Sequence, residues 1–321
     1  MIHIGINGFG RIGKNLWHLL LNETSICVSA VNHPMITIDL FKYMANNDTL
    51  LPHINVEIED MDGDVLVNGR KVKLTGFNKP SEIEWEGVDV VVDCSGKFKN
   101  KEELRGHLRG DVKMVILSAP AGDDMDVVIN GVSEIFEDNI ISCGSCTTNC
   151  LAPVLDVIDK KFGVEFCNFL TVHAMTASQT VSDRKNIKDF RLGRNAFQNI
   201  IPTTTGASRL VKKLFPHLVG RVFGSSCRVP VENGSYLEIN FKVKEDVDVE
   251  SIFDALENNE IIEISDNKNV SSDIKKLDKI CCIDKDLVVV YNEKTFKIGV
   301  WYNNEAGYVR QIIEFIRKNF I

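Results

Sequence analysis

The sequence predicts an α/β protein in two parts: a doubly wound parallel-sheet domain, then an α+β domain with a mainly antiparallel sheet. Before about residue 146, short apolar runs rich in β-branched residues alternate with amphipathic helical runs, which is the pattern of βαβ units. After that point the strand-like runs become longer. The length of 321 residues also favours two domains, because one hydrophobic core rarely serves so long a chain.

Four runs in the first part have the composition of strands covered on both faces. They are IHIGIN (2–7), ICVSAVN (26–32), VDVVVDC (88–94) and VKMVILSAP (112–120). Between them, apolar residues at helical spacing predict helices over 11–22, 36–47 and 101–110. The pair Asn68-Gly69 between alternating runs predicts a tight hairpin beside this sheet.

The second part begins with a predicted helix over 147–163, which Gly163 ends. Longer strands are predicted at FCNFLTVHAMT (166–176), VFGSSCRVPV (222–231), GSYLEINFKVK (234–244) and TFKIGVWY (295–302), with helices over 205–215, 249–259 and 304–320. The charged segment from about Ser178 to Ile201 has little periodicity. We expect it to be a long ordered or partner-contacting loop.

The formal net charge of −8 gives no electrostatic footprint for nucleic acid or for a membrane surface. No apolar run approaches the roughly 18 residues of a membrane span. The first residues, MIHIGINGFG, enter a strand-like run without the pattern of a signal peptide. We therefore expect a cytoplasmic protein, whose nine scattered cysteines are free thiols.

The stretch GINGFGRIGK carries the pattern G-x-G-x-x-G at Gly8, Gly10 and Gly13, after a strand and at the start of a helix. In this setting the first glycine makes a tight turn, the second lets backbone approach a pyrophosphate, and the third lets helix and strand pack closely. The helix N-terminus then faces the phosphates. The motif predicts dinucleotide binding, and an unliganded turn is the alternative.

A carboxylate is expected about 20 residues further on, where it hydrogen-bonds the adenosine ribose. The sequence has Asn32 and His33 there instead. NAD is the expected cofactor, but NADP is left open, because the repulsion by which a carboxylate would exclude a 2′-phosphate is missing. His33 is either a ribose contact or a solvent-facing loop residue.

Three cysteines stand in SCGSCTTNC (142–150). A zinc site needs a second chelating pair, but Cys281 and Cys282 are adjacent and would point to opposite faces of a strand. A ferredoxin-type run would need one more cysteine and a proline where Leu151 stands. We therefore predict no metal here, and the choice is between a nucleophile and buried structural thiols.

Cys146 lies where a strand-like run ends and a helix begins, a place where the thiolate is stabilised by helix N–H groups. Cys143 and Cys150 lack that advantage and are expected to be packed. Of the seven histidines, His173 is the best partner, because it ends an apolar run where polar residues begin. A satisfied core histidine is the alternative reading of His173.

With these motifs, the chain resembles the phosphorylating glyceraldehyde-3-phosphate dehydrogenases from end to end. The matching runs, in the order of that family, are INGFGRIGK, LSAP, SCTTNC, TVHAMTASQ, IIPTTTGA, RVPV and WYNNEAGY. The resemblance implies a dinucleotide-binding domain over 1–146, completed by a C-terminal helix over 304–321. A catalytic domain over 147–303 is implied between them.

The resemblance also implies a reaction. Cys146 would attack the aldehyde of glyceraldehyde 3-phosphate, with His173 as the base. Hydride would pass to NAD and leave a thioester, and inorganic phosphate would release 1,3-bisphosphoglycerate. A homotetramer is implied as well, with the loop from Ser178 reaching a neighbouring subunit.

The family positions can be carried over residue by residue. The implied phosphate-binding residues are Ser145, Thr147, Thr176, Thr205, Gly206 and Arg228, and the implied cofactor contacts are Gly8, Gly10, Arg11, Ile12, Gly13, His33, Ser118 and Asn304. Without the resemblance, Thr176 would be read as a strand cap and Arg228 as a surface charge.

Three departures from the family pattern lie on the cofactor side. His33 replaces an aspartate, TLLPH (49–53) replaces a Ser-Thr-His-Gly segment, and Ala306 replaces an aromatic residue. Two alternatives stay open. An erythrose-4-phosphate dehydrogenase would hydrolyse its thioester, and Thr176 with TTTG argues against it. A non-catalytic nucleotide- or RNA-binding protein is disfavoured by Cys146, His173 and the acidic charge.

Overall fold

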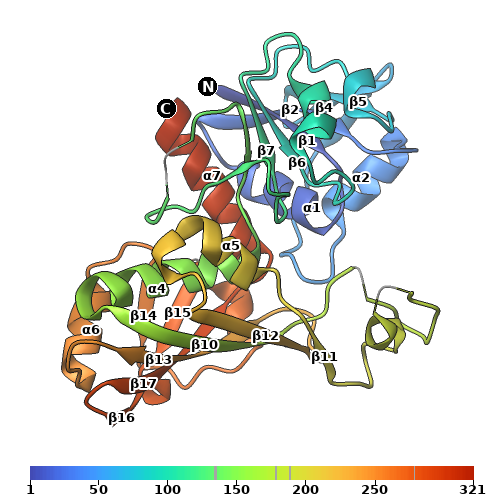
Figure 1. The fold of residues 1–321 in the computed structure, drawn as a ribbon. Helices are drawn as coiled ribbons and strands as arrows, with labels where there is room; N and C mark the ends of the chain where they lie inside the picture. The colour runs from blue at the N-terminus through green and yellow to red at the C-terminus, as the bar shows by residue number, and fades with distance from the viewer. Residues whose placement is uncertain (134–135, 178, 188, 278) are drawn as a thin grey trace. The chain divides into compact units, whose positions relative to one another are not determined.

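The computed structural model describes residues 1–133, 136–177, 179–187, 189–277 and 279–321 (Figure 1). The chain divides into two structural units. Unit 1 comprises Met1–Val128, Ile135–Gly144 and Ile312–Ile321, and unit 2 comprises Ile129–Glu134 and Ser145–Gln311. Each unit is built on a sheet of its own.

Unit 1 has a nine-stranded sheet in the order β3-β4-β5-β2-β1-β6-β7-β9-β8. Its strands are β1 (Ile2–Asn7), β2 (Ile26–Asn32), β3 (Ile58–Met61), β4 (Asp64–Val67), β5 (Arg70–Thr75), β6 (Val90–Asp93), β7 (Met114–Leu117), β8 (Asp126–Val127) and β9 (Ile140–Ser142). From β5 to β8 in this order, neighbouring strands are parallel. This is the doubly wound order, in which ligands bind at the carboxyl ends of the strands. The predicted fold class is confirmed, and so is the Asn68-Gly69 hairpin between β4 and β5.

Helix α1 (Arg11–Leu20) follows β1 directly, and the three motif glycines have different structural roles. Gly8 has a φ of +98°, a turn conformation that favours glycine. A Cβ added to Gly13 would lie 2.1 Å from the carbonyl oxygen of Gly8, so helix and strand approach too closely for any side chain. Gly10 has a φ of −86° and open space where a Cβ would be. Only Gly8 and Gly13 are therefore required by the fold itself.

The helix predicted over 101–110 is wrong in its length. Helix α3 spans Lys101–Leu104 alone, and the chain continues as the 3-10 turn η2 (Arg105–His107). Gly106 packs against the backbone of another 3-10 turn, η1 (Pro80–Glu82), where a Cβ would be 2.7 Å from a backbone nitrogen. Tertiary packing overrides the helical pattern here.

A buried hydrogen-bond network joins the carboxyl ends of β1, β2 and β6. Trp85 Nε1 donates to His107 Nδ1 (3.0 Å), which leaves the ring proton on Nε2, 3.2 Å from Asp93 Oδ2. Asn7 Nδ2 donates to the same oxygen (2.6 Å), and Asn32 Nδ2 donates to Asn7 Oδ1 (2.8 Å). A buried carboxylate needs such partners. The network therefore fixes the strand ends that flank the glycine motif.

Unit 2 has an eight-stranded sheet in the order β11-β12-β10-β13-β17-β15-β14, with β16 paired to β17. Its strands are β10 (Val164–His173), β11 (Ile201–Thr203), β12 (Val222–Arg228), β13 (Ser235–Val243), β14 (Ile262–Ser265), β15 (Cys281–Asp284), β16 (Val289–Asn292) and β17 (Thr295–Tyr302). All the described pairings in it are antiparallel except β10–β12 and β14–β15. The predicted mainly antiparallel sheet is confirmed.

Helices α4 (Cys146–Phe162), α5 (Ala207–Leu214) and α6 (Val249–Glu257) pack on one face of this sheet (Figure 1). Alternate residues of β10 are buried on that face, including Phe169, Thr171 and His173. Helix α4 ends before Gly163, whose φ is +67°. The remaining helices are α2 (Ile38–Asn46), α7 (Ala306–Phe320) and the 3-10 turns η3 (Phe190–Gly193), η4 (Pro216–Leu218), η5 (Asp273–Lys276) and η6 (Lys285–Leu287).

The opposite face of the unit 2 sheet exposes apolar side chains. Phe166 of β10 and Phe223 of β12 are 43% and 51% exposed, with ring centroids 5.8 Å apart. The predicted loop before β11 exposes Phe190 and Ile200 as well; its residues 178 and 188 lie outside the described residues. Exposed apolar surface of this kind is typical of contact with another molecule. In the described part of the chain, no helix is long and apolar enough to cross a membrane.

Two glycine substitutions test which of the motif glycines the fold requires. We expect Gly13→Ala to lower the unfolding temperature by roughly 3–10 °C, because the added methyl overlaps the Gly8 carbonyl. Gly10→Ala, the matched control, should stay within roughly 3 °C of the parent, since its Cβ meets open space. Thermal unfolding followed by circular dichroism measures both. Equal losses in the two variants would contradict the different roles given to the two glycines.

Candidate active site

The glycine motif presents the N-terminus of α1. Its N-cap residue, Gly10, has no side chain to bond the N–H groups of the first turn, and a helix N-terminus without a side-chain cap is suited to receive an anion. The predicted cofactor contacts Arg11 and Ile12 are the first two residues of the helix. The Arg11 guanidinium and the Lys14 ammonium both pair with Asp48. Burial would raise the pKa of the Asp48 carboxyl, but these two cations outweigh burial and hold the pKa well below its usual range.

Two other predicted cofactor contacts stand at strand ends in the same unit. Ser118, directly after β7, donates from Oγ to the carbonyl oxygen of Asp93 (2.9 Å). His33, directly after β2, accepts at Nδ1 from the backbone N–H of Phe9 (3.3 Å). His33 also lines a pocket of about 290 Å³ together with Gly8 and Gly10. The structure therefore brings His33 and the glycine motif to one pocket.

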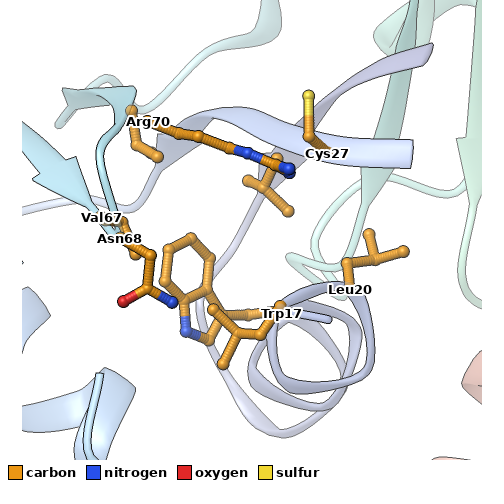
Figure 2. A pocket seen from close by; sticks show the side chains of 9 residues that line it. Trp17, Leu20, Cys27, Val67, Asn68 and Arg70 are labelled. Atoms are coloured by element: carbon orange, nitrogen blue, oxygen red, sulfur yellow. The ribbon is translucent and has the colours of Figure 1, made fainter. Parts of the chain in front are cut away.

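Unit 1 has a second pocket, of about 130 Å³, between α1, β2 and the β4–β5 hairpin. Figure 2 shows Trp17 and Leu20 of α1 on one side of it, with Asn68 and Arg70 from the hairpin and Cys27 from β2 around the rest. The thiol of Cys27 lies 3.4 Å from an imidazole nitrogen of His3. Cys27 stands within a strand and lacks the helix N-terminus that stabilises a thiolate. No residue predicted for the reaction lines this pocket.

Cys146 is the first residue of α4. The preceding residue, Ser145, is the N-cap, and its Oγ accepts from the backbone N–H of Thr148 (3.1 Å). Cys143 and Cys150 are buried, and burial raises the pKa of the Cys143 thiol to about 12. Cys146 is only half-buried. It is therefore the accessible thiol of the three.

His173 and Arg228 are register partners at the ends of the parallel strands β10 and β12. His173 Nε2 lies 3.4 Å from Cys146 Sγ. Arg228 Nη1 lies 2.6 Å from His173 Nδ1 and donates to the Ala174 carbonyl oxygen (3.0 Å). Three side chains that are 27 and 55 residues apart along the chain thus meet at one place in unit 2.

The charges at this place favour an anion. Burial and then the Arg228 guanidinium lower the pKa of His173 to about 3, so its ring is neutral at pH 7 and able to accept a proton. Burial raises the pKa of Cys146, and the Arg228 charge and the N–H of Thr147 oppose that rise. None of the described carboxylates forms an ion pair with Arg228. The buried positive charge of Arg228 is therefore available to be neutralised by a bound anion.

The tautomer of His173 decides which nitrogen can act as a base. His173 Nδ1 lies 2.7 Å from the Ala174 carbonyl oxygen. The tautomer with Nδ1–H donates to that carbonyl and leaves the Nε2 lone pair facing the thiol, whereas the tautomer with a bare Nδ1 accepts from Arg228 Nη1 (2.6 Å) and carries its proton on Nε2. Base catalysis at Nε2 requires the first of these tautomers. A half-buried thiol, a neutral imidazole and a buried guanidinium in contact can add sulfur to a carbonyl carbon and stabilise the resulting oxyanion.

Tyr302 lies beside Cys146 and His173 in this site, and it was not predicted from the sequence. Its hydroxyl lies 3.0 Å from Thr147 Oγ1 and 2.8 Å from Thr171 Oγ1, and its ring meets the edge of His173 with centroids 5.9 Å apart. It is fully buried, and burial raises the pKa of its hydroxyl well above the usual value. Tyr302 therefore stays protonated and holds Thr147 beneath Cys146. Its only sequence signal was its place in WYNNEAGY.

Ser235 is a second missed residue, and it connects Asn304 to the histidine. Asn304 Oδ1 accepts from Ser235 Oγ (3.1 Å) and from the N–H of Gly234 (3.3 Å). Ser235 Oγ in turn accepts from the N–H of Ala174 (3.0 Å). The peptide groups of Ala174 are thus bonded on one side to Ser235 and on the other to Arg228. Asn304, predicted as a cofactor contact, and His173 share this support.

The other predicted phosphate-binding residues have local roles in the structure. The backbone N–H of Thr176 donates to Gln179 Oε1 (3.1 Å), and Thr205 Oγ1 accepts from the N–H of Ala207 (3.2 Å) at the start of α5. Gly206 is the N-cap of α5. Their meeting with Arg228 around a phosphate stays a prediction. Within the described residues, no three metal-binding side chains converge, and all nine cysteines are free thiols.

Comparisons with known proteins match both parts of the chain. A family model described as "Glyceraldehyde 3-phosphate dehydrogenase, NAD binding domain" matches residues 2–101, and its C-terminal domain counterpart matches residues 145–304. The chain is 36% identical to glyceraldehyde-3-phosphate dehydrogenase 1 of Giardia intestinalis, over 98% of this chain and 96% of that protein. It is 35% identical to the cytosolic glyceraldehyde-3-phosphate dehydrogenase of Gracilaria gracilis, with the same coverage. The third relative, glyceraldehyde-3-phosphate dehydrogenase 1 of Bacillus cereus, is 35% identical over 98% of this chain and 97% of its own length.

The Arg228 charge should control the reactivity of Cys146. Because the guanidinium lowers the pKa of the thiol, Arg228→Gln should move the pH midpoint of Cys146 alkylation upward and slow alkylation at pH 7 by about fivefold or more. Arg228→Lys, which keeps a cation, should lie between the variant and the parent. Iodoacetamide rates, with the labelled cysteine identified by peptide mass spectrometry, measure the effect. A midpoint that is unchanged or lower in Arg228→Gln would contradict it.

Proposed function

Because the chain belongs to the glyceraldehyde-3-phosphate dehydrogenase family, we propose that it oxidises glyceraldehyde 3-phosphate to 1,3-bisphosphoglycerate, with NAD and inorganic phosphate, in glycolysis. The observation that carries this proposal is the contact of Cys146 Sγ with His173 Nε2 at 3.4 Å, beside a buried Arg228. The predicted resemblance to this family is confirmed by the comparisons.

The residues of the glycine motif fit NAD. Gly10 leaves open space over the N-terminus of α1, where the N–H groups of the first turn can receive a pyrophosphate. When bound, NAD supplies the acceptor for a hydride. We assign Gly8, Gly10, Arg11, Ile12, Gly13, His33, Ser118 and Asn304 to its binding.

Cys146 and His173 carry out the proton and sulfur steps. The thiol gives its proton to His173 Nε2 as sulfur attacks the aldehyde carbon, and the imidazolium then returns that proton to the new oxyanion to form a thiohemiacetal. Loss of the hydroxyl proton to His173 and of the hydride from the same carbon leaves a thioester on Cys146. An oxygen of inorganic phosphate then attacks the thioester carbon. The acyl phosphate leaves, and sulfur regains its proton.

Arg228 explains how an acidic chain attracts two anions. The net charge is −8, yet the guanidinium beside Cys146 has no ion-pair partner among the described carboxylates. A phosphate there would neutralise it, and a guanidinium suits phosphate oxygens in geometry. We assign Ser145, Thr147, Thr176, Thr205 and Gly206 to the same two anions. The free energy of anion binding is then available to both steps that involve a phosphate.

We propose further that the protein is a homotetramer that acts in the cytosol. The exposed Phe166–Phe223 pair on the sheet of unit 2 supports an interface there, and Phe190 and Ile200 support another on the loop before β11. One relative is named as cytosolic. The functional division is assigned to residues 1–146 with 304–321 for the cofactor and 147–303 for catalysis.

The reaction is tested by NADH formation from glyceraldehyde 3-phosphate. Cys146→Ser should abolish turnover, since oxygen at this place forms no thioester, and His173→Asn should lower kcat by about 10²–10⁴. Without phosphate or arsenate, NADH should stop after about one turnover per chain. Continued turnover without phosphate would indicate the hydrolytic erythrose-4-phosphate dehydrogenase type of reaction, and full activity of Cys146→Ser would rule out the thioester.

The assembly is tested by light scattering after size exclusion. The parent should elute as four chains, and Phe223→Glu should give smaller species, because it buries a charge in the proposed interface. Val249→Glu is the matched control, since Val249 is also exposed but lies on α6, on the opposite face of the sheet. A parent monomer, or equal behaviour of the two variants, would exclude this interface.

A further inference from the structure

The pocket beside the glycine motif has no acidic residue in its described lining. It includes Gly8, Gly10, His33, Asn78 and Lys97. In doubly wound domains, the residue after the second strand selects the adenosine ribose. A carboxylate there accepts from the 2′-hydroxyl and repels a 2′-phosphate. Here that residue is His33, so the ribose end of the pocket carries no repulsion of this kind.

The ring of His33 is held so that it offers a donor. Its Nδ1 accepts from the N–H of Phe9 (3.3 Å), so the neutral ring carries its proton on Nε2. Within the described residues, nothing hydrogen-bonds Nε2. A carboxylate in this position would accept a hydrogen bond from a ribose hydroxyl. His33 instead donates a hydrogen bond, and the strongest acceptor for it is an anionic oxygen.

Lys97 places a positive charge in the same pocket. Its ammonium forms no ion pair with a described carboxylate, and its charge reaches the imidazole, because it lowers the pKa of His33 in addition to burial. The pocket thus holds a cation and an N–H donor, neither of which has a partner among the described residues. Both are complementary to a dianion attached to the ribose.

We propose that this pocket accepts the 2′-phosphate of NADP, with Lys97 and His33 Nε2–H as its ligands, so that the chain binds NADP as well as NAD. The inference rests on the proposed function for its placement of the adenosine ribose beside His33. It extends that function by naming a second cofactor and the two side chains that admit it.

Equilibrium binding in the absence of aldehyde tests the proposal. Titration calorimetry of the full-length protein with NAD, NADP, 5′-AMP and 2′,5′-ADP should give NADP a Kd within about tenfold of that of NAD. It should give 2′,5′-ADP a lower Kd than 5′-AMP. NADP binding more than about 100-fold weaker than NAD binding would overturn the proposal.

Three variants identify the ligands of the phosphate. Lys97→Gln should weaken NADP by about fivefold and leave NAD within about twofold. His33→Asp should raise the ratio of the Kd for NADP to the Kd for NAD by about tenfold or more, because the new carboxylate repels the 2′-phosphate. Lys99→Gln is the matched control, because Lys99 is also exposed and two residues away but does not line the pocket. Equal effects of Lys97→Gln and Lys99→Gln on NADP would overturn the assignment.

The outcomes separate this inference from the proposed function. A protein that shows this binding pattern but forms no NADH from glyceraldehyde 3-phosphate would refute the reaction and leave the 2′-phosphate site standing. A protein that forms NADH from glyceraldehyde 3-phosphate but fails to bind NADP in the titration would refute the 2′-phosphate site and leave the proposed reaction standing.

Discussion

The contact between the Cys146 thiol and the His173 imidazole is the interaction on which the function of this protein depends. It exists only because the N-terminus of α4 lies over the carboxyl end of β10, with Cys146 Sγ 3.4 Å from His173 Nε2. The register of β10 with β12 then sets Arg228 beside His173. Tyr302 hydrogen-bonds Thr147, the residue after Cys146, and Ser235 accepts from the N–H of Ala174, the residue after His173. A shift of one residue in either strand would turn His173 or Arg228 to the other face.

The same burial that forms this site also opposes its chemistry. It disfavours both the thiolate and the imidazolium, and the Arg228 charge helps the first while opposing the second. A bound phosphate would neutralise Arg228 and so raise the affinity of His173 for a proton. Substrate binding and base strength are thereby coupled through one guanidinium. This gives a physical reason for a buried cation that pairs with none of the described carboxylates.

Much of this arrangement was predictable from the sequence, because its signals are local. Capping residues predict helix α4 and its end at Gly163. The chemistry of a helix N-terminus distinguishes Cys146 from Cys143 and Cys150. The helix predicted over 101–110 was too long, because it is ended by the packing of Gly106 against η1, and the residues of 101–110 alone do not show that contact. Tyr302 and Ser235 were missed because ordinary hydroxyls gain their role from register across strands. The pairing of Arg11 with Asp48 was not predicted either, because the two residues are 37 positions apart and only the tertiary fold brings them together.

The central claim is that oxidation is held as a thioester on Cys146 until phosphate arrives. The most direct measurement is the intact mass of the protein, quenched in acid after mixing with glyceraldehyde 3-phosphate and NAD without phosphate. One 3-phosphoglyceroyl group per chain is expected, located on Cys146 by peptide mapping and lost when phosphate is added before the quench. NADH formed with no acyl adduct, or an adduct on another cysteine, would contradict it.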